Sequence, residues 1–434
     1  MQWKNKPSAI LIGLLLIHVI AHIDRNMLLS FSPQITKELG LNNQQYGFLT
    51  GAVWVLSFGL MALFMGSLAD RFSRTRVMAF GVLVWSACTA ASGYAHNFEQ
   101  MVAARFLVAT GEAALVPAAI SLLSELFTAQ RRSTAVGVFF IGIPLGIGLA
   151  FVIAGTLGTT LGWRHTFLAL GTVGALITLP LVWLEDERAG AESAERGAHF
   201  VLQVRAVWAA LQGSRPLRQT IIGFVLVHFA FAGLSFVQLW LVRERSMDGA
   251  SMARQMGALQ ILFGTLGAVL GGVASDRLSR RFAGGHATVL ALMVLVCAPL
   301  MLAYRFAPPG SALFYVGMCA GFFLPLACYG PSNALIQALT PTSMRSTITG
   351  ATMMLINVLA IALGNLAVGA LSDRLAAGGS AAALSTALVA TDVLVGLALW
   401  FYWRAANANA SAALPLDAGP ARLASINRSS VGHQ

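Results

Sequence analysis

The sequence predicts an all-α membrane protein with twelve transmembrane helices, arranged as two pseudo-symmetric bundles of six. The composition is the first observation behind this prediction: the 434 residues are 57% hydrophobic and only 10% charged, which excludes an ordinary soluble domain. The second is a repeat, because GSLADRFSR at 66–74 returns half a chain later as GVASDRLSR at 272–280. A repeat of this kind inside a membrane protein indicates two homologous halves that face each other.

Apolar stretches of about 20 residues, the length that crosses a ~30 Å hydrocarbon core as a helix, recur along the whole chain. We expect spans at 8–31, 45–68, 77–95, 100–124, 134–158, 163–184, 217–241, 252–274, 287–306, 311–337, 347–371 and 381–403. The longest polar interruption follows the sixth span, so the chain divides into six spans plus six.

The same pattern predicts the domain organisation. An N-terminal lobe covers 1–184, a cytoplasmic linker 185–216 and a C-terminal lobe 217–404, and 405–434 form a disordered cytoplasmic tail that is rich in Ala, Asn and Ser. In the second part of the linker, apolar residues recur at helical spacing. This predicts an amphipathic helix, either on the membrane surface or packed under the bundle.

The distribution of basic residues predicts the orientation. The formal net charge is +11, which would suggest nucleic acid for a soluble protein, but here Lys and Arg gather in the loops on one side of the spans. By the positive-inside rule both termini are cytoplasmic, in a multi-pass protein of the inner (plasma) membrane whose first span is not cleaved. Arg243, Arg245 and Arg254 are exceptions on the other side.

Both copies of the repeated signature fall at cytoplasmic loop junctions and predict a gate. Glycines allow helices to approach closely, and acidic side chains can face the N-terminus of a neighbouring helix. The arginines can pair with carboxylates or lipid phosphates, although alone they could simply anchor the topology. The expected gate residues are Gly66, Asp70, Arg71, Arg74, Glu125, Gly272, Asp276, Arg277 and Arg280. A third GxxSD string, at 369–373 on the outer side, is given no role.

The repeated signature closely resembles the loop signature of the major facilitator superfamily, and the likeness covers essentially the full chain. The resemblance implies the major facilitator fold, in which two lobes rock about a central site. We therefore expect a gate that holds in one state and breaks in the other.

Ionisable groups within the membrane are costly and usually face a cavity, so each is a functional hypothesis. The first span carries His18, His22, Asp24 and Arg25, and the fourth carries Arg105 and Glu112. At ~1.5 Å per residue the depths of the two groups match, so Asp24 or Arg25 should pair with the fourth span. A carboxylate near the midplane can couple a proton to transport if each side exposes it in turn. Glu112 as a purely structural partner of an arginine is the alternative.

Several strings look like those of the spinster-like branch of the superfamily, in the manner of a bacterial member: IDRNMLLSF, ARFLVATGEAALVPAA, SELFTAQRRSTA, FFIGIPLGIGLA and GWRHTF. Members of that branch move lysophospholipids, sphingosine phosphates or related amphiphiles. By resemblance, Asp24 and Glu112 match proton-coupling carboxylates, and Arg25 and Arg105 match anion-binding cations, with His22 beside them. Organic-anion symporters of the superfamily also carry an Asp-Arg pair in the first span, so that alternative stays open.

The remaining polar residues in the spans are candidates for a cavity lining. His18 and His22 have the i, i+4 spacing of metal ligands, but no third ligand is evident, so we expect no metal. The second lobe contains almost no buried charge, and Asp392 stands alone there as a packing or interfacial group. The expected cavity residues are His18, His228, Gln238, Tyr329, Asn333 and Asn357.

Absent motifs narrow the function. There is no GxxxxGK[ST] loop for a nucleotide-driven pump, and no HExxH or GxSxG for an enzyme. We therefore expect a monomeric secondary transporter without cofactors, which is proton-coupled and moves a lysolipid-like amphiphile by a rocker-switch motion in the lipid bilayer. A proton-coupled carrier of a small organic anion is the alternative, and a channel is a third reading.

Overall fold

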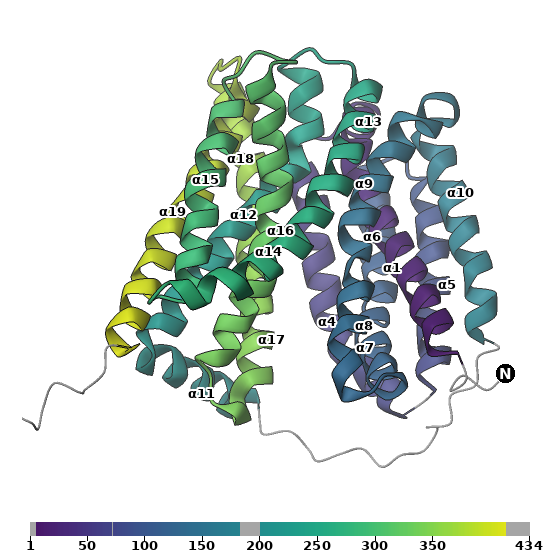
Figure 1. The fold of residues 1–434 in the computed structure, drawn as a ribbon. Helices are drawn as coiled ribbons and strands as arrows, with labels where there is room; N and C mark the ends of the chain where they lie inside the picture. Colours follow the sequence, from purple (N-terminus) through teal and green to yellow (C-terminus); the bar gives the residue numbers. More distant parts are fainter. Residues whose placement is uncertain (1–5, 72, 183–199, 414–434) are drawn as a thin grey trace, which may run out of the picture.

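The computed structural model describes residues 6–71, 73–182 and 200–413, and the regular structure in these ranges is helical throughout. Eleven helices of the described ranges are long and apolar enough to cross a membrane. The remaining expected span, 45–68, lies within the helical backbone that runs from Asn43 to Arg71 and is not among those eleven. The predicted all-α fold with two six-helix lobes is confirmed (Figure 1).

Each lobe is built from six membrane-crossing segments, some of them broken into two helices. The first lobe contains α1 (Pro7–Ser30), α2 (Ser32–Glu38), α3 (Asn43–Gly47), the π-helix η2 (Phe48–Ala52), α4 (Val53–Arg71), α5 (Arg74–Ser92), α6 (Phe98–Glu112), α7 (Leu115–Leu126), α8 (Ala129–Phe140), α9 (Gly142–Gly155) and α10 (Leu157–Val182). Of these, α6 with α7 forms the fourth span and α8 with α9 the fifth.

The second lobe repeats this plan after the linker helix α11 (Phe200–Gly213). It contains α12 (Arg215–Arg243), α13 (Gly249–Leu259), η3 (Gln260–Gly264), α14 (Thr265–Leu278), η4 (Ser279–Arg281), α15 (His286–Tyr304), α16 (Ala312–Ala338), η5 (Thr342–Met344), α17 (Arg345–Leu355), η6 (Ile356–Leu363), α18 (Gly364–Ala377) and α19 (Ala383–Ala413). The helix α19 continues nine residues beyond the predicted end of the lobe at 404, because its alanines favour helix and Ala405 and Ala406 are buried. The rest of the expected tail, 414–434, lies outside the described residues.

Local sequence signals account for several helix ends. The side chains of Asn97, Asp248 and Ser311 each accept a hydrogen bond from a backbone N–H in the first turn of the following helix. The breaks that start α7 and α9 are each followed by a proline two residues into the new helix, Pro117 and Pro144. Proline is tolerated there because the first-turn N–H groups have no partner within the helix.

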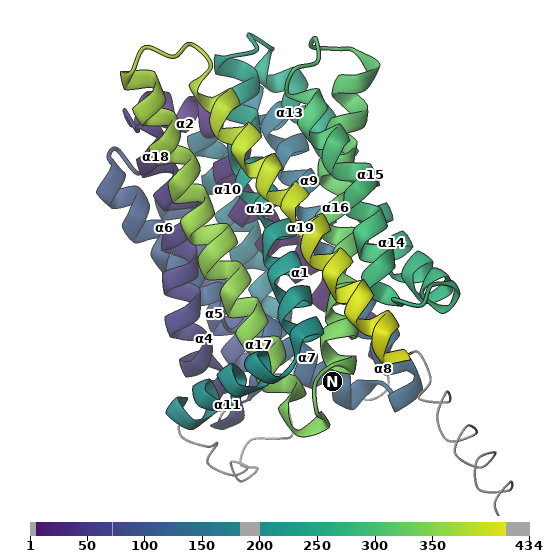
Figure 2. The same ribbon diagram turned by 90° about the vertical axis from the view of Figure 1, so that its left-hand side faces the viewer.

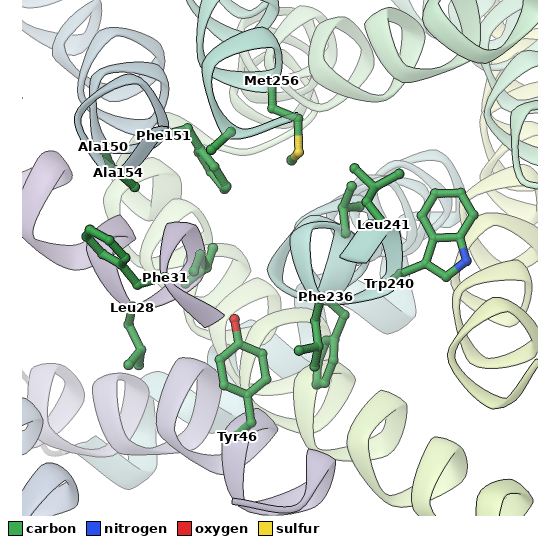
Figure 3. Packing of buried hydrophobic residues seen from close by; sticks show 14 of the residues in the cluster. Leu28, Phe31, Tyr46, Ala150, Phe151, Ala154, Phe236, Trp240, Leu241 and Met256 are labelled. Carbon is green, nitrogen blue, oxygen red and sulfur yellow. The ribbon is translucent and has the colours of Figure 1, made fainter. Parts of the chain in front are cut away.

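Among the described residues, the largest buried cluster that joins the two lobes lies towards one end of the molecule. We call the end where α1 begins and α19 ends the terminal face, and the other end the opposite face. One buried apolar cluster near the opposite face draws side chains from both lobes, with Tyr46 and Phe151 from the first and Phe236 and Met256 from the second (Figure 3). Towards the terminal face the larger buried clusters each belong to a single lobe. The structure is therefore closed at the opposite face.

Close backbone contact between α9 and α13 explains how the lobes join so tightly. A Cβ placed on Gly148 would lie 2.6 Å from the carbonyl oxygen of Gly257, and one placed on Gly257 would lie 2.5 Å from that of Gly148. Only glycine permits this approach, as small residues do between helices in bilayers.

The linker helix α11 lies at the terminal face beneath the second lobe (Figure 2). Its Val207, Ala210 and Leu211 pack against a buried cluster of that lobe, while Trp208 is 64% exposed. The helix expected in the linker is thus present and is packed against α12 and α17. Residues 183–199 lie outside the described part of the chain.

Candidate substrate and proton site

The first and fourth spans are joined by a buried ion pair, as their matching depths predicted. Nη1 of Arg105 on α6 lies 2.9 Å from Oδ1 of Asp24 on α1, and the two side chains are 7% and 1% exposed. Thr89 on α5 donates its hydroxyl to Oδ2 of the same carboxylate. The carboxylate is therefore held by two helices in addition to its own.

Arg105 also fastens the backbone of α1. Its Nη2 donates to the carbonyl oxygen of Asp24 at 3.1 Å and to that of Arg25 at 3.4 Å. These carbonyls lie six and five residues before the end of α1, so the guanidinium pins the helix near its last turns. With these partners, Arg105 is a fixed cation in this conformation. In the described residues, Arg25 forms no ion pair with the carboxylate of Asp24.

The indole of Trp54 contacts both Arg25 and Glu112. The guanidinium carbon of Arg25 lies 3.5 Å from the ring centroid of Trp54, which is the second residue of α4. The Nε1–H of Trp54 donates to Oε2 of Glu112 at 2.7 Å. Glu112 is 7% exposed, and its other oxygen, Oε1, is buried and receives no hydrogen bond from the described residues. Trp54 could not be predicted as a site residue, because a tryptophan in an apolar span usually serves only in packing.

The two histidines of α1 lie against α8 and α9. The Nδ1 atom of His18 is 2.9 Å from the carbonyl oxygen of Phe139, and the two rings stack at 4.2 Å. The ring of His22 meets that of His18 edge-on at 4.8 Å. His18 is only 2% exposed, so in this conformation it packs between helices. His22 is half-buried and lies closer to Arg25 in the chain.

At the opposite face, charged side chains of the second lobe cap helices of the first. Both carboxylate oxygens of Asp373 accept backbone N–H groups at the start of α3, from Asn43 at 3.1 Å and Gln44 at 2.8 Å. The guanidinium of Arg254 donates to the carbonyl oxygen of Gly155, the last residue of α9, at 2.6 Å. An acid at a helix N-terminus and a cation at a C-terminus both complement the helix dipole.

A third contact at this face comes from Arg243. It donates to Oδ1 of Asn43 at 3.0 Å and to Oγ1 of Thr36 at 2.7 Å. Two of the exceptions to the positive-inside rule, Arg243 and Arg254, therefore join the lobes. Asp373, the last residue of the GxxSD string that was given no role, joins them as well. We call Asp373, Arg243 and Arg254 with these partners the opposite-face latch.

The expected gate residues at the terminal face are only partly engaged. Nη2 of Arg74 lies 2.5 Å from Oε2 of Glu125, and Nη1 of Arg74 donates to Ser121, so this pair joins α5 to α7 within one lobe. Asp276, Arg277 and Arg280 are exposed, and a Cβ on Gly272 would meet none of the described residues within 4 Å. The side chains of the corresponding Gly66, Asp70 and Arg71 lie outside the described residues.

A family model described as the Major Facilitator Superfamily matches residues 14–365. The chain belongs to the Major Facilitator Superfamily. It is accordingly a membrane transporter of small molecules and not an enzyme. The match includes both repeated signatures, Arg243 and Arg254 of the opposite-face latch, and the charged residues of the first and fourth spans. Asp373 lies beyond its end.

Within the superfamily, the chain is similar to spinster proteins and to carriers of other substrates. It is 26% identical to protein spinster of Drosophila melanogaster over 66% of this chain and 48% of that protein. It is 27% identical to the probable L-galactonate transporter of Escherichia coli over 66% of this chain and 65% of that one. It is 26% identical to the sphingosine-1-phosphate transporter of Xenopus tropicalis over 72% and 60%. The matches thus span about half to two thirds of these relatives' lengths.

A solved structure confirms the fold. A bacterial homologue of the human lysosomal transporter spinster, crystallised in an inward-facing and unoccupied conformation, superposes with a TM-score of 0.80 over 95% of this chain and 99% of that chain, at 22% identity. The expected likeness to the spinster-like branch is therefore confirmed. At this identity the superposition establishes the arrangement of helices.

In the second lobe of the superfamily fold, only some of the expected cavity residues come together. The rings of His228 and Tyr329 are 6.1 Å apart, and Asn333 donates to the carbonyl oxygen of Tyr329 at 2.9 Å. Asn357, on η6, is half-buried. Gln238 instead donates to the carbonyl oxygen of Gly249 at 2.7 Å, at the opposite face, and so lies apart from the others.

Asp392 is not alone, which corrects the sequence-based expectation. Its Oδ2 lies 2.7 Å from Nε of Arg305, and the side chains are 1% and 3% exposed. Arg305 is the C-cap residue of α15, and a cation at the end of a span resembles a loop residue in the sequence. The guanidinium carbon of Arg305 lies 4.4 Å from the ring centroid of Tyr304 and 5.0 Å from that of Trp240.

Proposed function

We propose that this chain is a proton-coupled secondary transporter that moves a lysolipid-like amphiphile by alternating access. One observation carries the proposal: Glu112 is buried, keeps an unpartnered carboxylate oxygen and lies across a single indole from Arg25. A carboxyl group in such a place can hold or release a proton while a cation nearby holds an anionic substrate. Asp24, already paired with Arg105, is the second proton-coupling candidate.

The proposed substrate is an amphiphile with an anionic head. Arg25 is the primary head-group cation, with Arg105 and His22 beside it, and the apolar chain lies along the second lobe near His228 and Tyr329. Asn333 and Asn357 complete the proposed cavity lining, and Gln238 enters only in the other conformation. The name of the Xenopus tropicalis relative, a sphingosine-1-phosphate transporter, supports this class of substrate.

The proposed transport cycle is a rocker-switch motion of the two lobes in a monomer. We assign the terminal face to the cytoplasm of a cell whose inner membrane holds the protein, so the described state is inward-facing. The gate residues of the two signatures would then meet when the opposite-face latch opens. The exposed Asp276, Arg277 and Arg280 support this assignment, because a gate that is open leaves such groups without partners.

The test is transport into proteoliposomes under an imposed proton gradient. Radiolabelled lysophosphatidic acid is the probe, and wild type is compared with Glu112→Gln. Glu99→Gln is the matched control, because Glu99 is an exposed acid in the first turn of the same helix, α6. We expect gradient-driven uptake by wild type and the control and its loss in Glu112→Gln. Uptake that survives Glu112→Gln would remove Glu112 as the coupling site.

A small organic anion is the second candidate substrate. The L-galactonate transporter of Escherichia coli, whose substrate is a sugar acid, supports it through 27% identity over 66% of this chain. Competition decides between the two: excess galactonate or benzoate should leave uptake of lysophosphatidic acid unchanged if the amphiphile is the substrate. Uptake of the small acid with no uptake of the lipid would favour the alternative. Conductance without saturable flux would instead indicate a channel.

A further inference from the structure

Trp54 stands between the two charged groups that the proposed function uses. The guanidinium carbon of Arg25 lies over one face of the indole, 3.5 Å from the ring centroid, and the indole N–H donates to Oε2 of Glu112 at 2.7 Å. The other face stacks on the ring of Phe58, with 4.5 Å between the ring centroids. An indole has a negative face and a positive N–H edge, so it suits a cation on the face and an anion at the edge. The arrangement is therefore complementary to an ionised Glu112 and a nearby guanidinium at the same time.

We propose that Trp54 is a positioning residue that links the protonation of Glu112 to the availability of Arg25. This inference rests on the proposed function. The indole N–H can only donate, and its hydrogen bond is stronger to a carboxylate than to a carboxylic acid. When a proton adds to the unpartnered Oε1, Oε2 stays an acceptor but becomes a weaker one. The indole then holds Arg25 less firmly, and the guanidinium is released to an anionic head group.

The other charges around Glu112 do not compete for this role. Asp24 on α1 faces the site but is bound to Arg105 and Thr89, and Arg105 is bound in return. The imidazoles of His18 and His22 pack against α8 and α9. The thiol of Cys88 on α5 lies towards Asp24. On α4 it is the indole of Trp54 that meets Glu112.

Two substitutions separate the edge of the indole from its face. Trp54→Phe keeps a ring for Arg25 but removes the N–H, and Trp54→Leu removes both. Trp400→Phe is the matched control, because Trp400 also lies under an arginine, Arg404, at 5.5 Å, but on the exposed side of α19. Uptake of radiolabelled lysophosphatidic acid is measured from pH 5 to 9 in proteoliposomes without a gradient, by exchange.

Trp54→Phe should shift the pH of half-maximal exchange upwards by about one to two units, since the carboxylate loses the one hydrogen-bond donor that the described residues supply. The KM for the lipid should fall with decreasing pH in wild type and Trp400→Phe, and should become independent of pH in Trp54→Leu. Wild-type midpoints and KM profiles in both Trp54 variants would overturn the proposal.

A spectroscopic readout keeps the test decisive if a variant does not transport. The infrared band of the protonated carboxyl group of Glu112 is identified by its absence in Glu112→Gln, and its titration midpoint should rise in Trp54→Phe. An unchanged midpoint overturns the role of Trp54. If Glu112→Gln instead keeps wild-type coupling, the proposed function fails first, so the two failures are distinguishable.

Discussion

At the scale of single residues, charge inside this bundle is held in pairs. In the described part of the chain each lobe buries one aspartate with one arginine, Asp24 with Arg105 and Asp392 with Arg305. Burying either charge alone would cost several kcal/mol, and the partner offsets this. The two pairs nevertheless differ in role, because only the first adjoins a further carboxyl group, that of Glu112.

Removing one member of the second pair should destabilise the fold without touching the proposed coupling site. Asp392→Asn leaves a buried guanidinium without its counter-charge, so the free energy of unfolding should fall by about 3–5 kcal/mol. The double variant Arg305→Met with Asp392→Leu should recover most of this loss. Thermal unfolding of the purified protein in detergent measures both. If Asp392→Asn were as stable as wild type, the structural role assigned to the pair would be contradicted.

At the scale of elements, each lobe fastens the start of its sixth span with a glutamate that follows its first span. Glu38, at the end of α2, accepts the indole N–H of Trp163 at 2.5 Å and Nε of Arg164 at 2.8 Å, both in α10. Glu244, just after α12, accepts the backbone N–H groups of Leu384 and Ser385 in the first turn of α19, at 2.6 and 2.8 Å. The duplication thus extends to a contact that the sequence signature does not include.

Glu38 provides a pH-dependent test of this clamp. The hydrogen bond from Trp163 is the larger of two that hold the pKa of Glu38 below its usual range, and the other comes from Arg164. The stabilisation is therefore fully present above the ordinary carboxylate pKa of about 4.3 and is lost as pH falls through the lower folded value. Because Glu38 is 48% exposed, Glu38→Gln should cost only about 0.5–1 kcal/mol at pH 7.

The cost of Glu38→Gln should shrink as the pH falls below about 4.3, because the wild-type carboxyl group then takes up a proton and loses its charge. Unfolding curves of both proteins at pH 7 and pH 3 measure this. Glu244→Gln is the companion variant in the other lobe and should cost about 1–2 kcal/mol at pH 7, since it weakens a cap on α19. A cost of Glu38→Gln that is equal at both pH values would show that the charge plays no part.

At the scale of the whole molecule, the state of the protein is decided by which face is latched. The opposite-face latch joins three charged side chains of the second lobe to residues of the first. Glycines bring the backbones of the two lobes into contact at the same face. A Cβ on Gly369 would lie 2.2 Å from the carbonyl oxygen of Asn43. Closure of this face therefore depends on the absence of a side chain at one position of the GxxSD string.

Gly369→Val should shift the population towards a state that is open at the opposite face. The overlap should cost the closed state about 1–3 kcal/mol, a change of about 5–150-fold in the ratio of the two states. Spin labels at Glu99 and Ser380, one on each lobe at this face, report the change as a longer distance in double electron–electron resonance.

Gly350→Val is the matched control, because Gly350 also lies in a helix of the second lobe, α17, and a Cβ there would meet none of the described residues within 4 Å. This variant should leave the measured distance at its wild-type value. An unchanged distance in Gly369→Val would show that the contact between Gly369 and Asn43 does not hold the face closed.

Much of the architecture could be predicted from the sequence. Twelve apolar stretches and a duplicated GxxxDRxSR string are local properties of the chain, so they predicted two six-helix lobes. Matching depths on two spans predicted that Asp24 or Arg25 would pair with the fourth span, and Arg105 does pair with Asp24. The helix in the linker also followed from its periodicity, although the helical extension of α19 to Ala413 did not.

The partners of individual side chains were harder to predict, because they depend on rotation of helices about their axes and on contacts across the lobes. Trp54 and Arg305 gave no signal: one resembles any apolar span residue and the other a loop cation. Gln238 was placed with the cavity residues because it is polar and within a span, yet its register along α12 brings it to Gly249 at the opposite face.

The sequence by itself determined the membrane class, the duplication and the concentration of charge in the first lobe, because hydrophobic length and residue spacing are written along the chain. Only the tertiary structure decided which face is closed, which arginine is committed to Asp24, and that an indole separates Arg25 from Glu112. These depend on helices packing at specific depths and rotations, and a rocking protein has more than one such packing for the same sequence.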